Sequence, residues 1–287
     1  MKVYINGKFL EKDKASVSVF DHGFLYGDGA FEGIRSYGSL VFKLEEHIDR
    51  LYETTHTLMI EASLSKKEMM KAIIDTLKIN HLKDAYIRVI VTRGEGDLGL
   101  DPRKCRGRAS IIIITDKITL YPPELYKKGM EIITVPTVRN HPEALNPQLK
   151  SLNYLNNILA KIEANNSGYA EAIMLDGSGY VAECTGDNIF MIKDGVLSTT
   201  NQGRLRGITR QTVLDIAQSH KISTQETFIT RHEIYNAQEC FLTGTAAEII
   251  PVVKVDGRAI GTGYPGAMTL KLMKWFHEVT RKDGVKY

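Results

Sequence analysis

The sequence has few of the features that mark disulfide-rich or metal-binding proteins. Its 287 residues include only three cysteines, Cys105, Cys184 and Cys240, which are far apart and form no Cys-x-x-Cys pair. The eight histidines show no His-Glu-x-x-His or other close ligand spacing. The sequence therefore predicts neither a disulfide framework nor a metal site.

Long apolar runs and clusters of one charge are also missing. No stretch approaches the ~18 apolar residues of a membrane span, and the N-terminus has no signal-peptide core. The 37 basic and 34 acidic residues are spread along the chain, without the basic stripe of nucleic-acid-binding proteins. Hydrophobic residues (43%) and charged residues (25%) have the proportions of an ordinary globular enzyme. We therefore expect a cytoplasmic protein with neither nucleic-acid nor membrane partners.

Length and the position of two prolines divide the chain. At 287 residues it exceeds the roughly 100 to 200 residues of one domain, which favours two domains. Pro122-Pro123 would interrupt a helix or a strand ladder, because proline lacks an amide hydrogen. We therefore expect an α/β fold with a small N-terminal domain at 1–117, a linker at 118–126 and a larger, β-rich domain with helices at 127–287.

Local patterns predict individual elements of both domains. Asn6-Gly7 predicts a β-hairpin, because both residues accept positive φ. Ser65 and Glu68 form a capping box at the start of a helix, and strand alternation over 86–92 puts Tyr86 and Arg88 on one face. Further strands are expected at 111–114, at 131–135 and within 170–198; further helices are expected at 44–58, at 154–166, from an N-cap at Thr209 to about His220, and after Pro265.

One glycine-rich segment has the spacing of a dinucleotide-binding fingerprint. Gly261-Thr262-Gly263-Tyr264-Pro265-Gly266 matches Gly-x-Gly-x-x-Gly. That fingerprint works only when it opens the first helix of a βαβ unit, and here the chain leaves space for one helix and no further strand. We interpret the segment as a turn before a terminal helix.

Four separated segments carry residues whose chemistry fits together. Lys150 stands just before a predicted amphipathic helix, and Glu183 is a carboxylate in an otherwise apolar, β-rich region. Residues 207–210 begin a helix, where free N–H groups favour an anion such as phosphate. Residues 242–247 form a small-residue loop whose backbone is open to a ligand. Taken singly, each is more simply a surface lysine, an exposed strand residue or an ordinary loop, so only the combination predicts a function.

The combination resembles the branched-chain aminotransferases, a family of class IV pyridoxal-phosphate enzymes of fold type IV. The similar segments are 24–35, 47–51, 85–88, 150–154, 183–190, 207–210 and 243–249, in one order over nearly the whole chain. The resemblance implies two α/β domains with pyridoxal 5′-phosphate in the cleft between them, and at least a homodimer. It also implies an enzyme that moves the amino group between branched-chain L-amino acids and 2-oxoglutarate.

The resemblance assigns roles at the cofactor to Arg50, Lys150, Tyr154, Glu183, Gly207, Ile208, Thr209 and Thr245. Lys150 would be the catalytic residue. Its amine, with an unperturbed pKa of ~10.4, must be neutral or in an imine with the cofactor, and it would move a proton at the substrate α-carbon. Glu183 would keep the pyridine nitrogen protonated, and Tyr154 would hydrogen-bond the phenolic oxygen. Arg50, the helix start at 207–209 and Thr245 would hold the phosphate.

The substrate residues implied by the resemblance are Tyr26, Phe31, Gly33, Tyr86, Arg88, Thr245, Ala246 and Ala247. Tyr86 and the backbone of 245–247 would bind the α-carboxylate, and Arg88 would receive the distal carboxylate of glutamate. Phe31, Gly33 and Tyr26 would shape an apolar side-chain pocket, although without the motif Phe31 and Tyr26 would be interpreted as core residues.

The sequence departs from the family in three places. Cys184 stands where glycine is common, and Asp187 stands where glutamate is frequent. The segment 198–206 is shorter than usual and carries Arg204 and Arg206, two cations that would either reinforce phosphate binding or admit a more acidic substrate. The sequence therefore constrains the preferred side chain of the substrate less than any other feature of the expected reaction.

Three other functions stay open. A D-amino-acid aminotransferase shares the fold and cofactor, but its Arg-x-His pair is replaced here by Arg103-Lys104-Cys105. An aminodeoxychorismate lyase would use the same lysine for elimination. A cofactor-free interaction module would have no use for Lys150, Tyr154 and Glu183 together.

Overall fold

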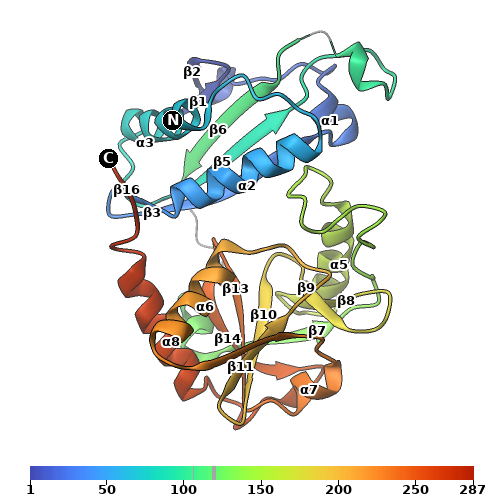
Figure 1. Cartoon of the computed structure of the whole chain (residues 1–287), viewed down its shortest axis with the longest axis vertical. Coiled ribbons are helices and arrows are strands. Elements are labelled where there is room, and N and C mark those ends of the chain that lie inside the picture. The colour runs from blue at the N-terminus through green and yellow to red at the C-terminus, as the bar shows by residue number, and fades with distance from the viewer. Residues whose placement is uncertain (106, 118–120) are drawn as a thin grey trace. The chain divides into compact units, whose positions relative to one another are not determined.

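The computed structural model describes residues 1–105, 107–117 and 121–287, which form two compact units (Figure 1). Unit 1 comprises Met1–Ile118, Leu149–Asn153 and Thr280–Tyr287; unit 2 comprises Thr119–Gln148 and Tyr154–Val279. Residues 118–120 of the expected linker lie outside the described residues. Residues 123–126 of the expected linker begin helix α4 (Pro123–Lys128), because proline suits a first helical position, where no amide hydrogen is needed.

Unit 1 is built on an antiparallel sheet whose described strands follow the order β16-β4-β3-β5-β6-β1-β2. The strands are β1 (Lys2–Ile5), β2 (Lys8–Glu11), β3 (Gly29–Tyr37), β4 (Leu40–Phe42), β5 (Ala85–Thr92), β6 (Ser110–Asp116) and β16 (Gly284–Lys286). The helices are α1 (His22–Tyr26), α2 (Leu44–Thr57) and α3 (Lys66–Ile79), with 3-10 turns at Lys12–Lys14 and Pro102–Lys104.

Helices α2 and α3 pack against this sheet, as Figure 1 shows. The predicted hairpin is confirmed, with Asn6 and Gly7 at φ values of 48° and 87°, and the predicted capping box begins α3. On β5 the buried Ile87 and Val89 belong to the apolar core shared with α2 and α3, so the half-buried Tyr86 and Arg88 lie on the opposite face. The predicted polar face of β5 is therefore confirmed.

Unit 2 contains a mixed sheet whose described strands follow the order β12-β11-β10-β13-β14-β7-β8-β9, with β15 beside β14. The strands are β7 (Met130–Thr134), β8 (Ala172–Leu175), β9 (Val181–Cys184), β10 (Asn188–Lys193), β11 (Val196–Thr200), β12 (Ser223–Thr227), β13 (Glu239–Gly244), β14 (Glu248–Val255) and β15 (Arg258–Ala259). The helices besides α4 are α5 (Leu155–Asn166), α6 (Ile208–Ser219), α7 (Arg231–Tyr235) and α8 (Ala267–Val279).

The central strands of unit 2 alternate between two faces. Leu242 of β13 and its pairing partner Ile250 of β14 lie in an apolar core, whereas Phe241 points to the other face and stacks on Phe190 of β10 at a centroid distance of 5.0 Å. Helices α6 and α8 contact β13, and α5 contacts β8. Glu183 lies on β9, and the loop 245–247 follows β13.

Two details differ from the sequence-based expectations. The N-cap of α6 is Gly207, so Thr209 lies inside the first turn instead of capping it. Helix α8 is followed by the short strand β16, which we did not expect because its three residues are too few to show a strand pattern. Strand β16 pairs antiparallel with β4, so it does not complete a βαβ unit. None of the helices in the described residues has the length and apolar character that crossing a bilayer requires.

Candidate active site

Lys150 lies beside strand β3 of unit 1. The backbone N–H of Phe31 donates to the Lys150 carbonyl at 2.9 Å, and the Leu152 N–H donates to the Gly29 carbonyl at 2.9 Å. Gly29 permits this approach, because a Cβ there would lie 2.7 Å from the Leu152 side chain. The Lys150 Nζ lies 4.6 Å from the centroid of the Phe31 ring. Backbone pairing therefore brings the lysine amine to the face of β3 that carries Phe31.

Strands β3 and β5 bring four of the predicted substrate residues together. Gly33 pairs with Arg88 in the antiparallel register, and the Arg88 guanidinium carbon lies 4.4 Å from the Phe31 ring centroid and 5.5 Å from that of Tyr86. The Tyr86 hydroxyl crosses Gly33 so closely that a Cβ there would lie 2.2 Å from it. Glycine is thus required at position 33 for this arrangement of Tyr86.

Tyr26 contacts a different part of unit 1. Its ring meets His22 edge-on at a centroid distance of 5.1 Å, and its hydroxyl donates to the Leu98 carbonyl. The structure therefore groups Phe31, Gly33 and Tyr86 through their contacts but does not place Tyr26 among them.

Arg50 is held by a buried carboxylate that sequence reasoning missed. Its Nε and Nη2 donate to the two oxygens of Glu32 at 2.6 and 2.9 Å, and His47 Nδ1 lies 2.8 Å from the same carboxylate. Burial alone would raise the pKa of Glu32, but Arg50 and His47 outweigh it and hold that pKa well below its ordinary range. Burial lowers the pKa of His47, although the neighbouring Glu32 acts to raise it. One edge of the Arg50 guanidinium is thus committed to Glu32.

In unit 2, Glu183 of β9 is buried among hydrogen-bond donors. Arg139 Nε donates to its Oε1 at 2.8 Å, and the side chains of both residues are 6% exposed. The Leu205 N–H and Asn188 Nδ2 donate to Oε2 at 3.0 and 3.2 Å. The charge of Glu183 is therefore compensated, which excludes the alternative of an exposed strand residue.

The N-termini of α6 and α8 differ in what occupies them. At α8, Glu239 accepts from the Met268 and Thr269 N–H groups at 3.0 and 2.7 Å, and a Cβ at Gly266 would lie 1.9 Å from its carboxyl carbon. This internal carboxylate fills the place where a dinucleotide pyrophosphate would sit, so the glycine-rich segment is a turn, as predicted. At α6, among the described residues, no side chain caps the start at Gly207. The α6 terminus is the one suited to an external anion.

The loop 245–247 joins β13 to β14. Gly244, the last residue of β13, precedes it, and a Cβ there would lie 1.9 Å from Asp187 Oδ1. Just before it, the hydroxyl of Thr243 is buried and has no hydrogen-bond partner in the described part of the chain. Thr243 was not among the predicted site residues, because a buried hydroxyl without a hydrogen-bond partner cannot be recognised without coordinates.

Tyr154, a predicted cofactor residue, is the N-cap residue of α5.

The departures from the family pattern have structural explanations. Arg204 is buried and donates to the Thr200 carbonyl at 2.5 Å and to Glu226 at 2.8 Å, a carboxylate that it shares with Arg210. Arg206 is exposed. Cys184 is fully buried in the apolar core, and burial raises the pKa of its thiol.

Asp187 belongs to a second buried acidic group, next to Glu171. The Tyr121 hydroxyl donates to both carboxylates, at 3.2 Å to Glu171 and 3.3 Å to Asp187. Burial and the nearby Glu171 raise the pKa of Asp187 to about 7.

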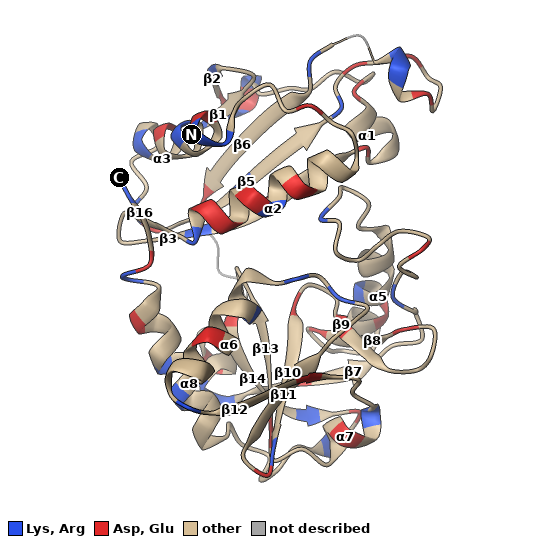
Figure 2. Ribbon diagram, viewed as in Figure 1, with Lys and Arg blue, Asp and Glu red and all other residues tan. Residues whose placement is uncertain are grey.

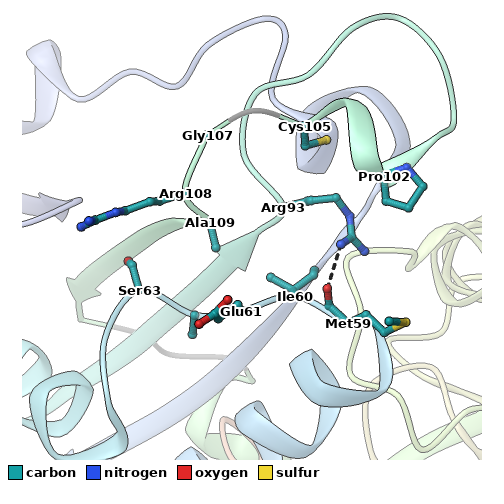
Figure 3. A pocket seen from close by; sticks show the side chains of 11 residues that line it. Met59, Ile60, Glu61, Ser63, Arg93, Pro102, Cys105, Gly107, Arg108 and Ala109 are labelled. Carbon is teal, nitrogen blue, oxygen red and sulfur yellow. Dashed lines mark hydrogen bonds between the residues drawn. The ribbon is translucent and has the colours of Figure 1, made fainter.

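A pocket of about 530 Å³ in unit 1 includes none of the predicted site residues (Figure 3). Arg93 reaches into it, but donates to the Met59 carbonyl at 3.0 Å and to both oxygens of Asp28, so its charge is neutralised. Basic and acidic residues are interspersed over the described parts of both units (Figure 2).

Comparison with known proteins identifies several relatives. A family model described as amino-transferase class IV matches residues 29–255. A provisionally named branched-chain-amino-acid aminotransferase of Methanocaldococcus jannaschii is 51% identical, covering 100% of this chain and 99% of that protein. The branched-chain-amino-acid aminotransferase of Pseudomonas aeruginosa is 38% identical, covering 96% and 92%. The D-alanine aminotransferase of Bacillus licheniformis is 35% identical, covering 94% and 93%.

Solved structures agree over nearly the whole chain. The T.th. branched-chain amino acid aminotransferase with pyridoxamine 5′-phosphate has a TM-score of 0.93 at 35% identity, covering 98% of this chain and 94% of that one. A structure of the same protein with 4-methylvaleric acid has a TM-score of 0.92 at 35% identity, covering 97% and 94%. The expected fold class is confirmed by these similarities.

Proposed function

Because the chain belongs to the class IV aminotransferases, we propose that it moves the amino group between branched-chain L-amino acids and 2-oxoglutarate, with pyridoxal 5′-phosphate as its cofactor. The observation that carries the proposal is the lysine amine of Lys150 beside Phe31, on the strand face that also holds Tyr86 and Arg88. An amine, an apolar ring and a guanidinium on one face supply the groups that such a pair of substrates requires.

The residues of unit 2 fit the charged parts of the cofactor. We assign its phosphate to the N–H groups of Ile208 and Thr209 in the first turn of α6, where no described side chain forms a cap. We assign its pyridine nitrogen to Glu183, whose buried carboxylate is kept in place by Arg139. Glycine at position 207 lets Asn188 approach the helix start, because a Cβ there would lie 2.0 Å from Asn188 Oδ1.

Three further cofactor roles are proposed on the family resemblance. Tyr154 would donate to the phenolic oxygen, and Thr245 would add a hydroxyl to the phosphate. Arg50 would also bind the phosphate, as a cation whose other edge remains with Glu32. The ion pair with Glu32 would then fix the direction of the guanidinium.

Lys150 would act on the substrate proton. When bound, pyridoxal phosphate supplies an electron sink for negative charge that develops at the substrate α-carbon. We propose that the Lys150 amine first anchors the cofactor and, once the substrate amine displaces it, accepts the proton from the α-carbon and delivers it to the C4′ position. Tyr86 and the backbone of 245–247 would hold the α-carboxylate during this transfer.

The substrate side chain would lie against Phe31 and Gly33, with Tyr26 as a further predicted contact. Arg88 would receive the distal carboxylate of glutamate, because it makes no ion pair with any carboxylate in the described part of the chain. An apolar ring beside the Arg88 guanidinium would thereby accommodate leucine and glutamate in turn.

A D-amino-acid aminotransferase is the second candidate, since one relative is a D-alanine aminotransferase at 35% identity. Its Arg-x-His pair is not supported here, because Arg103 is 88% exposed and paired with Asp101. The experiment that decides is a panel of L- and D-amino donors against 2-oxoglutarate. Best turnover with L-leucine, L-isoleucine and L-valine supports the proposal, and best turnover with D-alanine would overturn it.

Arg88 and Arg204 provide the matched pair for specificity. Arg88→Ala should lower the activity with 2-oxoglutarate more than the activity with leucine. The difference should correspond to about 1 to 3 kcal/mol of lost hydrogen bonding. Arg204→Ala should affect both substrates equally, because its guanidinium is bound to Glu226. Selectivity of Arg204→Ala without selectivity of Arg88→Ala would contradict the pocket as assigned.

A homodimer is proposed as well. Unit 1 has several exposed large apolar side chains near α1, namely Val19, Phe20, Phe24, Leu98 and Leu100, with exposures of 50 to 79%. Burying such side chains against a second copy would stabilise the assembly. Light scattering should give twice the chain mass for the wild type and a lower mass for Phe24→Glu. The cytoplasmic location stays a prediction from the sequence.

A further inference from the structure

The loop 245–247 closes at a residue with an unfavourable backbone conformation. Glu248 has a φ of 59°, in the left-handed region that glycine and asparagine adopt far more readily than glutamate. It pairs with Gly244 at the point where β13 and β14 meet the loop. Glu248 is the ladder partner of Gly244, and a left-handed position at the end of a hairpin turn is usually occupied by glycine. A glutamate here therefore needs a reason beyond the turn.

The side chain of Glu248 supplies that reason. Its Oε2 lies 2.8 Å from His277 Nε2, on helix α8. The Glu248 side chain is only 14% exposed, whereas His277 is 51% exposed. The contact ties the first residue of β14, directly after the loop, to a helix that itself packs on β13 and β14. At the other end of the loop, Gly244 lies so close to Asp187 that a Cβ at position 244 would be 1.9 Å from its Oδ1.

We propose that Glu248 and His277 form a positioning pair that orients the backbone N–H groups of 245–247 toward the substrate α-carboxylate. This rests on the proposed function, in which that backbone binds the carboxylate. Because Gly244 and Glu248 are paired, the dihedral angles of Glu248 limit the directions that the peptide groups between them can take. A left-handed residue persists only where its surroundings hold it, and such positions concentrate at ligand clamps. The hydrogen bond to His277 contributes to holding Glu248 in this conformation.

The pair makes stability and binding respond differently to one substitution. Glycine adopts the φ of Glu248 without strain, so Glu248→Gly should keep or raise the unfolding temperature of the cofactor-free protein. The same change removes the contact with His277 and adds backbone freedom, so the loop should bind a carboxylate less well. If Glu248 merely stabilised the fold, the substitution would lower both the unfolding temperature and the affinity for the carboxylate.

The test measures binding of 4-methylvaleric acid, a leucine-like carboxylate without an amino group, to the cofactor-loaded enzyme by visible absorption. Glu248→Gly and His277→Ala should each weaken binding by about tenfold, the factor that corresponds to about 1.4 kcal/mol. Glu248→Gln keeps an oxygen that accepts from His277, so it should stay within about twofold of the wild type. Glu278→Gln, at an exposed neighbour on α8, is the matched control.

The outcomes separate the two proposals. If the wild type neither transaminates nor binds the acid, the proposed function fails and the pair has nothing to position. If the wild type binds but Glu248→Gly and His277→Ala bind equally well, the function stands and the positioning role is overturned. Loss of binding in Glu248→Gly together with a lower unfolding temperature would also overturn it, in favour of a structural role.

Discussion

Arg139 provides a sharp test of how unit 2 holds Glu183. Both side chains are 6% exposed, and the Nε to Oε1 distance is 2.8 Å. We consider Arg139→Met, which keeps an unbranched apolar stem and removes the guanidinium. The substitution leaves the Glu183 carboxylate buried without its cation, so the folded state should lose stability.

The contacts of Glu183 set the size of the loss. Removing one partner of a buried ion pair costs about 3 to 5 kcal/mol. Glu183 keeps two donors, the Leu205 N–H and Asn188 Nδ2, so we expect the lower end, about 3 kcal/mol. The double variant Arg139→Met/Glu183→Gln removes both charges of this buried pair. Its loss of stability should therefore fall to about 1 to 2 kcal/mol, which is the cost of hydrogen bonds that are not fully made.

The single tryptophan makes the measurement specific for unit 2. Trp275 lies on α8 and stacks on His220 with ring centroids 3.7 Å apart. Its fluorescence during urea unfolding of the cofactor-free protein therefore follows unit 2 and not unit 1. Lys254→Met is the matched control, because Lys254 and Glu131 form a pair that is 40% and 51% exposed and should contribute less than about 1 kcal/mol.

If Arg139→Met lowered the free energy of unfolding by less than about 1 kcal/mol, the buried pair would contribute no more than an exposed ion pair does, and the reasoning would be refuted. A double variant as unstable as Arg139→Met alone would show that the arginine stabilises unit 2 by packing and not by charge.

Other tests address the lysine, the glutamate and the second acidic group. Borohydride reduction should fix the cofactor on Lys150, and peptide mapping that placed it on Lys161 would contradict the assignment; Lys150→Ala should lose turnover. Glu183→Gln should remain folded but lose rate by orders of magnitude, because a neutral amide cannot keep the pyridine nitrogen protonated, and near-normal activity would remove that role. The pKa of Asp187 is raised to about 7 in the folded protein, against ~3.9 in the unfolded chain. The folded protein is therefore most stable while Asp187 is protonated, and this stability is lost as the pH rises from ~4 to about 7. Asp187→Asn should therefore unfold at a higher temperature than the wild type above pH 7, and the difference should vanish toward pH ~4, whereas a difference independent of pH would contradict the shift.

Features that depend on neighbouring residues were predictable from the sequence. The Asn6-Gly7 hairpin, the capping box of α3 and the shared face of Tyr86 and Arg88 all follow from short-range rules of turn chemistry and strand alternation. The misplaced cap at Thr209 shows the limit of such rules. Threonine is a good N-cap by type, but the chain ahead of α6 already turns at Gly207.

Features that depend on distant residues were not predictable. Arg139 lies 44 positions from Glu183, and nothing near either residue indicates that they meet. His47 and Arg50 are three apart on α2, which predicts a shared helix face, but their common partner Glu32 is defined only by how α2 packs on β3. The left-handed φ of Glu248 was hidden for a further reason, because the residue type argues against that conformation.

Two of the arginines that the sequence offered for a distal carboxylate, Arg88 and Arg204, show what the structure adds. Strand alternation put Arg88 on the face of Tyr86, but no local pattern says which of the two arginines is already paired. Their surroundings do: Arg204 is buried with its guanidinium on Glu226, and using it for a substrate would require breaking that pair. Arg88 instead lies against the aromatic faces of Phe31 and Tyr86, which orient a guanidinium without neutralising it. An oriented cation that keeps its charge can accept glutamate's second carboxylate and still border an apolar side chain, and this combination is what an enzyme with two unlike substrates requires.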